Sequence, residues 1–256
     1  MSFLDPVLNP VLMPIIELSP FLAIVILAFV LSVLITLVYK YFTNQAEMKK
    51  LKDQQKEYQN KMKELRSQPE EMMKVQKEAM KANLDYMKHS FKPTLITMLP
   101  ILLIFGWMTA HLTYEPLLPG EAFGITAEFK EGIIGPAELI VPEGVELQPQ
   151  AEQEINAGKA TWNLKSPAGT FFVTLKKGEL EQNKKITVTE KLKYEEPISI
   201  YQDSEIEKIT VYHNKLRPMG REFTVPIVNW QPGWLGVYII FSLIFSLGLR
   251  KIFKLH

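Results

Sequence analysis

The chain has 256 residues and a formal net charge of +1, which hides a strong separation of charged from apolar segments. It contains no cysteine, so disulfide bonds and thiol chemistry are excluded. The four histidines, His89, His111, His213 and His256, lie far apart and lack the spacing of metal ligands. We therefore expect no metal site.

Three apolar segments are long enough to cross a membrane. Residues 21–39 carry no charge before Lys40, and at about 1.5 Å per residue they cross a hydrocarbon core of about 30 Å. Residues 94–113 form a second such run, and residues 234–249 form a shorter third one. This pattern predicts a helical membrane protein with a three-span core.

Basic residues predict the side of each connecting segment, because cytoplasmic flanks carry an excess of Lys and Arg. Residues 40–92 hold 13 basic and 8 acidic side chains, whereas residues 114–230 hold 13 basic and 18 acidic ones. Residues 1–19 carry two acids and no base, and residues 250–256 carry three bases and no acid. We predict a multi-pass protein of the cell membrane with its N-terminus outside and its C-terminus in the cytoplasm.

The first 19 residues lack the basic region of a cleaved signal peptide, so we expect the first span to be retained as an anchor. Pro6, Pro10 and Pro14 break the short apolar stretch that precedes it. This stretch either lies in the outer interface or packs on the third span.

The segment between the first two spans is predicted to form a cytoplasmic coiled-coil hairpin. Its first helix has a seam with spacings of 3 and 4, made of Met48, Leu51, Gln55, Tyr58, Met62 and Leu65. After a stop at residues 67–69, apolar positions resume at Met72, Val75, Ala79, Met80, Leu84, Met87 and Phe91. Pro93 is then expected to open the second span.

Six methionines lie in this hairpin segment. They either contact varied apolar partners, to which a flexible thioether side chain adapts, or fill the seam between the two helices. Met73 lies off the seam and is the best candidate for an exposed contact.

Small hydroxyl residues supply most of the polar atoms within the spans. The centres of the spans carry no Asp, Glu, Lys or Arg, which argues against a proton relay, an ion-coupled pump or a voltage sensor. Ser32 and Thr36 share one helix face, as do Ser242 and Ser246. These hydroxyls either line a mildly polar groove open to the cytoplasm, or bond their own helix backbone and allow close packing.

The third span contains Trp234, Gly236, Tyr238, Phe241, Ser242, Phe245 and Ser246, and the second contains Pro100, Gly106 and Trp107. Together with the order of span, basic hairpin, span, outer region and span, this pattern resembles the archaeal members of the YidC and Oxa superfamily of membrane-protein insertases. It also resembles the third subunit of the endoplasmic-reticulum membrane protein complex. The resemblance covers about half of the chain.

The resemblance implies an insertase or chaperone for protein transport, which receives hydrophobic segments at the cytoplasmic face and releases them into the bilayer. The resemblance implies that the protein uses no nucleotide and no cofactor and has no catalytic residue. The implied groove is lined by Ser32, Thr36, Thr97, Ser242 and Ser246, with Lys40, Arg250 and Lys251 at its mouth. Met72, Met73 and Met80 are the implied client contacts. The implied partners are newly made membrane proteins and lipid, with the ribosome and small helical membrane subunits as further candidates.

Two features depart from the family pattern. Bacterial members carry an arginine in the groove that these spans lack, so the resemblance does not imply a charge-based pull on acidic clients. The region of residues 114–230 is larger than the outer connection of a minimal three-span member.

Residues 114–230 are predicted to form an extracytoplasmic β-rich, sandwich-like domain, because β-branched and aromatic residues alternate with polar ones. The main candidate strands are residues 124–129, 137–141, 160–165, 170–175, 185–189 and 208–212, in a total of six or seven. The domain shows no catalytic motif, which favours a binding or shielding module over an enzyme.

The predicted organisation has seven segments: an outer N-terminal segment (1–19), a first span (20–41), the cytoplasmic hairpin (42–92), a second span (93–113), the outer β domain (114–230), a third span (231–249) and a basic cytoplasmic tail (250–256). The alternative to an insertase is a membrane-anchored structural or interaction protein that displays the β domain.

Overall fold

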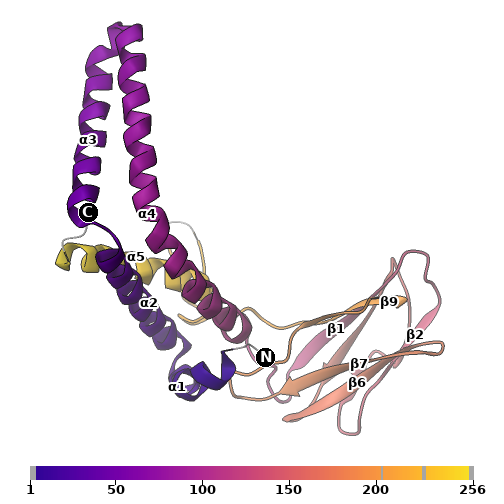
Figure 1. The fold of residues 1–256 in the computed structure, drawn as a ribbon. Coiled ribbons are helices and arrows are strands. Elements are labelled where there is room, and N and C mark those ends of the chain that lie inside the picture. The colour runs from indigo at the N-terminus through magenta and orange to yellow at the C-terminus, as the bar shows by residue number, and fades with distance from the viewer. Residues whose placement is uncertain (1–3, 203, 227–228, 254–256) are drawn as a thin grey trace. The chain divides into compact units, whose positions relative to one another are not determined.

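The computed structural model describes residues 4–202, 204–226 and 229–253, and for Arg66, His89, Ser90 and Lys92 it describes the backbone alone. The chain divides into two compact units. The helical unit contains residues 21–106 together with the chain from residue 235 onward, and the β unit contains the first 20 residues together with residues 107–234. Figure 1 shows the elements of both units.

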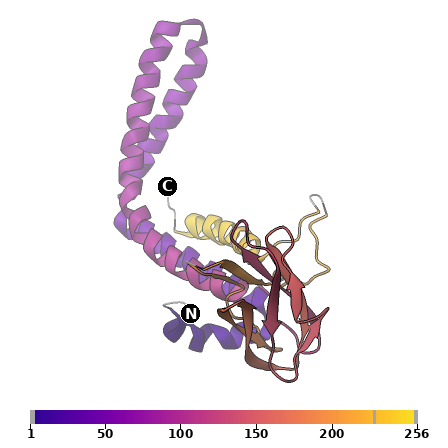
Figure 2. The ribbon, with the colours of Figure 1, turned by 90° about the vertical axis from the view of Figure 1, so that its right-hand side faces the viewer.

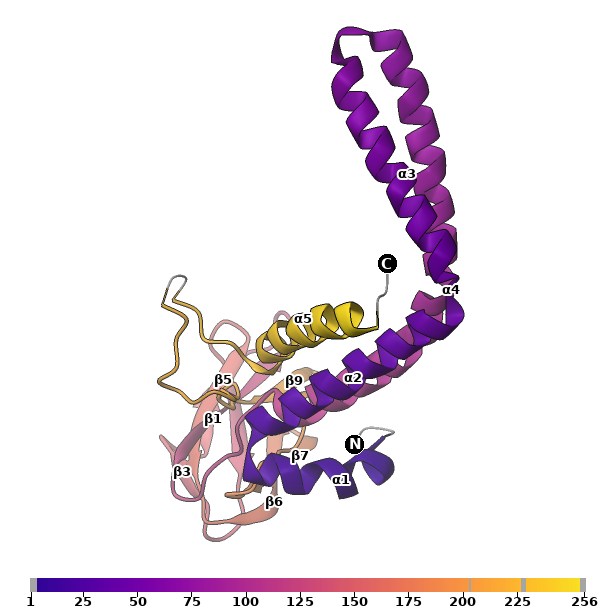
Figure 3. The ribbon, with the colours of Figure 1, turned by 90° about the vertical axis from the view of Figure 1, so that its left-hand side faces the viewer.

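The helical unit is built from α2 (Pro20–Phe42), α3 (Gln45–Glu64), the short 3₁₀ helix η1 (Leu65–Ser67), α4 (Pro69–Leu112) and α5 (Trp234–Ile252). In the described residues, three helical segments are long and apolar enough to span a membrane: Pro20–Phe42, Pro93–Leu112 and Trp234–Ile252. Within this unit α2 lies alongside the second half of α4 (Figures 1 and 3). The three predicted spans are therefore present as helices.

The longest element, α4, is a single helix of 44 residues that runs through both Pro93 and Pro100. The predicted start of the second span at Pro93 agrees with the apolar segment Pro93–Leu112, but the helix that contains this span starts earlier, at Pro69. A proline inside a helix costs about 3 kcal/mol. Ending the helix in a bilayer would instead leave several backbone groups without partners, each at a cost of several kcal/mol. The hairpin and the second span thus belong to one helix.

The hairpin begins and turns at identifiable signals. The Asn44 side chain caps α3 by accepting a hydrogen bond from the backbone N–H of Glu47 at 3.3 Å. Pro69 occupies the first position of α4. A backbone N–H at this position would have no partner within the helix, so a proline costs no hydrogen bond there. Figures 1 and 2 show α3 alongside the first half of α4, and the Gln55 amide donates to Asn83 Oδ1 at 3.1 Å.

The third span is longer than its apolar run. The sequence predicted residues 234–249, but α5 continues through Arg250 and Lys251 to Ile252. Both basic residues have long side chains that can extend to the membrane–water interface, so the charges do not force the helix to stop.

The β unit contains two antiparallel sheets. The five-stranded sheet has the order β3-β5-β1-β9-β8, and the four-stranded sheet has the order β4-β2-β6-β7. The strands are β1 (Ala122–Phe129), β2 (Pro136–Ile140), β3 (Glu146–Gln148), β4 (Glu152–Glu154), β5 (Lys159–Lys165), β6 (Gly169–Lys177), β7 (Leu180–Val188), β8 (Ile198–Ile200) and β9 (Ile206–Val211). The six main predicted strands are present, and β3, β4 and β8 add three short ones.

Side chains from both sheets share one hydrophobic core. Every second residue of β5 is buried, and the largest of these, Trp162, is fully buried and donates its indole N–H to the Ala151 carbonyl at 2.9 Å. On the other sheet, Leu139, Leu175 and Ile186 are also fully buried. The alternation seen in the sequence therefore separates the core face of each strand from its solvent face.

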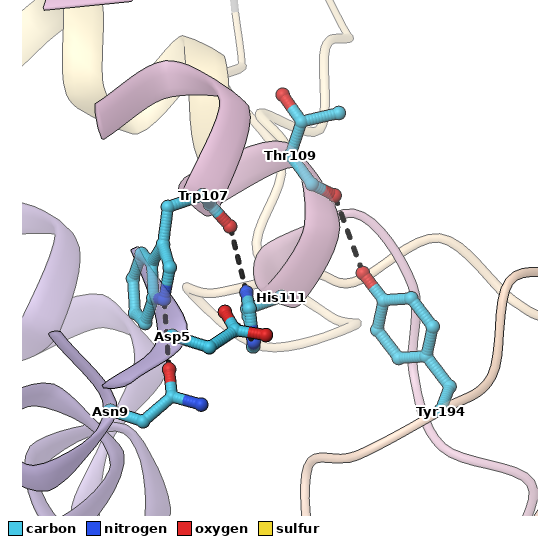
Figure 4. Close-up of polar contacts among 6 residues, drawn as sticks. All are labelled: Asp5, Asn9, Trp107, Thr109, His111 and Tyr194. Carbon is cyan, nitrogen blue, oxygen red and sulfur yellow. Dashed lines mark hydrogen bonds and ion pairs between the residues drawn. The ribbon is translucent and has the colours of Figure 1, made fainter. Parts of the chain in front are cut away.

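The N-terminal segment is a helix, α1 (Asp5–Leu18), although it contains Pro10 and Pro14. The expectation that prolines break this stretch is wrong. Figure 4 shows the contacts at its N-terminal half: Trp107 Nε1 donates to Asn9 Oδ1 at 2.8 Å, and His111 Nε2 lies 3.3 Å from Asp5 Oδ1. Leu12 and Ile16 are buried along the same helix. These tertiary contacts compensate for the hydrogen bonds that the prolines remove.

The Asn9–Trp107 contact generates a prediction. Trp107 is fully buried, so Asn9→Ala leaves its indole N–H without an acceptor, at a cost of about 1–3 kcal/mol. We expect the variant to lose α1 packing, measured as faster limited proteolysis of the N-terminal segment in detergent. The matched control is Val11→Ala, on the same helix at a side chain that is 64% exposed. Equal protection of wild type and Asn9→Ala would contradict the prediction.

Glu128 generates a second prediction. In the centre of its sheet it lies directly opposite Lys208 on one side and Lys159 on the other, with ion-pair distances of 2.7 and 3.7 Å. The hydrogen bond from Lys208 lowers the pKa of Glu128, against an opposing effect of burial. A lowered pKa in the folded state adds stability above the unfolded-state pKa of about 4.3, and this stability is lost as the pH falls through the folded-state value.

We therefore expect Glu128→Gln to lower the free energy of unfolding by about 1 kcal/mol at neutral pH, and by progressively less as the pH falls below about 4. Thermal unfolding of the full chain, followed by the circular dichroism of the β unit, measures the difference. Glu181→Gln is the control, because it removes the exposed cross-strand pair with Lys176. If Glu128→Gln lowered the free energy of unfolding by the same amount at every pH, this account would be contradicted.

Candidate functional site

The helical unit holds α2 and α5 together through aromatic rings. Phe21 meets Phe241 and Phe29 meets Phe245 edge to face, with ring centroids 5.5 and 5.3 Å apart. Contacts that advance in the same direction along both helices show that α2 and α5 run parallel. A third edge-to-face pair of α4 and α5, Phe105 with Tyr238, has a centroid distance of 4.8 Å.

The basic residues predicted at the mouth of a groove lie at the C-terminal ends of these two helices. Lys40 Nζ lies 4.8 Å from the centroid of the Phe253 ring, and the Arg250 guanidinium lies 5.9 Å from that of Tyr39. Each helix thus supplies one cation and one aromatic ring to the other. Lys40 and Arg250 thus lie at the same end of this helix pair, and all three basic side chains, Lys251 included, are exposed.

The predicted groove-lining hydroxyls are distributed over three helices. Ser32, Thr36 and Thr97 are buried, while Ser242 and Ser246 are half-buried. Ser32 Oγ donates to the Ser242 carbonyl at 3.5 Å, so α2 and α5 meet at this pair. The structure thus places Ser32 and Ser242 side by side.

Most of these hydroxyls bond the backbone of their own helix. Thr36 Oγ1 donates to the Ser32 carbonyl at 2.6 Å, and Thr97 Oγ1 donates to the Pro93 carbonyl at 3.1 Å. Ser242 Oγ donates to the Ile239 carbonyl at 3.0 Å. Such bonds satisfy a hydroxyl inside a membrane and support the packing interpretation of these residues. Their role as groove walls stays a prediction.

The first helix of the hairpin matches its predicted seam. Met48 is buried, and Leu51, Gln55, Tyr58, Met62 and Leu65 are half-buried, whereas the intervening Lys and Glu side chains are exposed. All six residues that were predicted to lie on the inward face of α3 are therefore buried or half-buried.

The inward face of α4 differs from its prediction. Met72, Val75 and Ala79 are half-buried as expected, but the face continues through Ala82, which is buried, and Tyr86. The predicted seam positions Met80, Leu84, Met87 and Phe91 are instead exposed. The larger apolar side chains of α4 therefore lie on another face.

These larger residues form an apolar stripe along α4, here called the α4 stripe, which the exposed Lys77 interrupts between Met73 and Met80. Each side chain is 47–62% exposed: Met73, Met80, Leu84, Met87, Phe91, Leu95, Met98 and Leu102. At about 100° per residue, the eight positions fall within an arc of roughly 80°, on the side of the helix away from the inward face. The stripe begins in the hairpin and ends within the second span, and it stays on the same face of α4 throughout.

Two of the three predicted client contacts, Met73 and Met80, belong to the stripe, and the third, Met72, lies half-buried on the inward face. Sequence reasoning missed the stripe because it assigned the second helix only one apolar face. The spacings of 7, 4, 3, 4, 4, 3 and 4 between the stripe residues were the available signal.

Comparisons with known proteins address the family. Residues 2–133, about half of the chain, match a family model described as integral membrane protein EMC3/TMCO1-like. No curated protein and no solved structure matches the chain. The matched residues include the first two spans and the whole hairpin. The match agrees with the resemblance to the third subunit of the endoplasmic-reticulum complex, while the wider YidC and Oxa superfamily and an archaeal origin stay predictions.

The matched family is associated in a general sense with membrane-protein insertion. Its match to half of the chain agrees with the three apolar helices, so the protein is an integral, multi-pass membrane protein. The chain belongs to the EMC3/TMCO1-like family of integral membrane proteins.

Proposed function

We propose that the protein is a nucleotide-independent insertase that receives hydrophobic segments at the cytoplasmic face of the cell membrane and releases them into the bilayer. The α4 stripe is the observation that carries this proposal. It offers a client an apolar surface that runs from Met80 in the hairpin to Leu102 in the second span.

The stripe suits a client of variable sequence. Burying an apolar side chain is worth about 25 cal/mol per Å² of surface removed from water, whatever the identity of the partner. Four of its eight residues are methionines, whose flexible side chains adapt to different partners. We further propose that α3 and the first half of α4 pack as a coiled coil, which keeps the stripe on the outside of the hairpin.

The proposed orientation places the hairpin in the cytoplasm and the β unit outside. Three spans put the hairpin and the β unit on opposite sides of the membrane, and the excess of basic residues favours the hairpin as the cytoplasmic one. The contacts of Asn9 and Asp5 with the C-terminal end of α4 support an N-terminus on the side of the β unit. The C-terminus is then cytoplasmic.

Transfer from the stripe into lipid would use the polar positions of the spans. In this proposal Ser32, Thr36, Thr97, Ser242 and Ser246 form the wall of a groove that admits a short polar flank, and Lys40, Arg250 and Lys251 surround its cytoplasmic mouth. Met72, Met73 and Met80 contact the client first. We assign no catalytic residue and no cofactor. The partners are newly made membrane proteins and lipid, and the ribosome and small helical membrane subunits are candidates.

A second candidate function is a membrane-anchored structural or interaction protein. The β unit favours this function. A short loop would be enough to connect the second span to the third, but the chain has a two-sheet domain with its own core there. In that case the hairpin binds one cytoplasmic partner, and loss of the protein leaves membrane-protein insertion unchanged.

The stripe predicts the effect of a double variant. Leu84→Ser with Met87→Ser removes two exposed apolar side chains, each worth about 1.5 kcal/mol or more if a client buries them. We expect insertion of a single-span client into liposomes that contain the purified full chain, with no nucleotide added, to fall at least tenfold.

The matched control is Ile198→Ser with Ile200→Ser, which makes the same kind of change at exposed positions of β8. Insertion that falls equally in both double variants, or in neither, would count against the stripe as the client path. Insertion by wild type no faster than in empty liposomes would favour the anchored interaction protein.

A further inference from the structure

The β unit contains a cavity close to the segments that follow α4 and precede α5. The cavity has a volume of about 290 Å³, near the lower end of the range for small-ligand sites. Its lining is polar and consists of Glu115, Asn214, Lys215, Arg217, Arg221 and Gln231. The family match ends at residue 133, before five of the six lining residues, and the client path on α4 does not include the cavity.

Hydrogen bonds between distant segments build the walls of the cavity. Tyr114 and Lys215 form an antiparallel bridge, and the Glu115 N–H donates to the Asn214 carbonyl at 2.8 Å. On the other side, Arg217 Nη1 donates to the Gln231 carbonyl at 2.8 Å, and Gln231 Nε2 donates to the Arg221 carbonyl at 3.0 Å. The cavity is therefore defined by the fold of the backbone.

The charge of the lining is positive. Arg221 forms a two-point ion pair with Glu115 and also lies within the electrostatic influence of Glu121. In the part of the chain that the structure describes, neither Lys215 nor Arg217 forms an ion pair with a carboxylate. Three basic residues within seven positions stand out in a region where acids outnumber bases by 18 to 13.

The covalent chain places the cavity at the level of the lipid headgroups. Glu115 lies three residues after the end of α4, and Gln231 lies three residues before the start of α5. Three extended residues reach at most about 11 Å and one headgroup layer is about 5–8 Å thick, so both residues lie within or just beyond that layer. Trp230, beside Gln231, is 44% exposed, as expected for an aromatic side chain in the membrane interface.

We propose that this cavity binds a phosphate group through Lys215 and Arg217, and that its source is an anionic phospholipid headgroup in the leaflet on the side of the β unit. A guanidinium group offers paired N–H donors that match phosphate oxygens, and a lysine ammonium adds a mobile charge. Arg221 stays paired with Glu115 and positions the wall. A bound headgroup would fix the β unit to the bilayer surface beside the ends of α4 and α5.

The test measures the thermal unfolding midpoint of the full chain in neutral detergent micelles. Phosphatidylglycerol, phosphatidylcholine or inorganic phosphate is added in increasing amounts. We expect phosphatidylglycerol to raise the midpoint and the other two to leave it unchanged. Lys215→Gln should raise the half-saturating phosphatidylglycerol concentration about tenfold, and Arg217→Gln should do at least the same. Because Lys215 is exposed, we expect Lys215→Gln to fold normally, and it remains a valid test even if Arg217→Gln destabilises the folded state.

Lys130→Gln is the matched control, since it removes an exposed positive charge just beyond the end of β1 that lies away from the cavity. An equal response of Lys130→Gln and Lys215→Gln, or equal stabilisation by both phospholipids, would overturn the proposal. Stabilisation by inorganic phosphate at comparable concentration would keep a phosphate site but overturn the lipid source. The unfolding midpoint does not depend on insertion activity. The test of the phosphate site is therefore separate from the test of the proposed function.

Discussion

The continuity of α4 is the constraint on which the account of the helical unit depends. Because one helix runs from Pro69 to Leu112 without interruption, a face that starts in the hairpin continues into the second span. One side carries small residues such as Ala82 and packs inward, and the other carries the exposed stripe. A break at Pro93 would have uncoupled the two halves. The helix therefore connects a surface outside the bilayer to one inside it.

Much of this arrangement could be predicted from the sequence, because the strongest signals are local. The three spans follow from uncharged apolar runs, and the six main strands follow from alternation of β-branched and polar residues. The seam of α3 was predictable because only one of its faces is apolar. In α4 two apolar faces compete, and periodicity alone does not tell which one packs on α3. In the structure the inward face is the one that carries Ala79 and Ala82.

Other features depend on contacts between residues far apart in the chain. Local rules disfavour a helix through Pro10 and Pro14, yet α1 forms and Trp107 bonds Asn9 across 98 residues. The short strands β3, β4 and β8 have three residues each, too few for a periodic pattern. Of the predicted site, Ser32 and Ser242 meet, but Met72 turns inward, and the basic cavity beside Glu115 had no motif to reveal it.

The most direct test of the central claim is site-specific photocrosslinking along α4 during the synthesis of a single-span client in native membranes. A crosslinker is placed in turn at Met73, Phe91 and Leu102 on the stripe, and at Glu78, an exposed residue on another face of the same helix. The account predicts client adducts at Met73 first, then at Phe91 and last at Leu102, with few at Glu78. Adducts that are absent from the stripe of the folded protein, or equally frequent at Glu78, would contradict it.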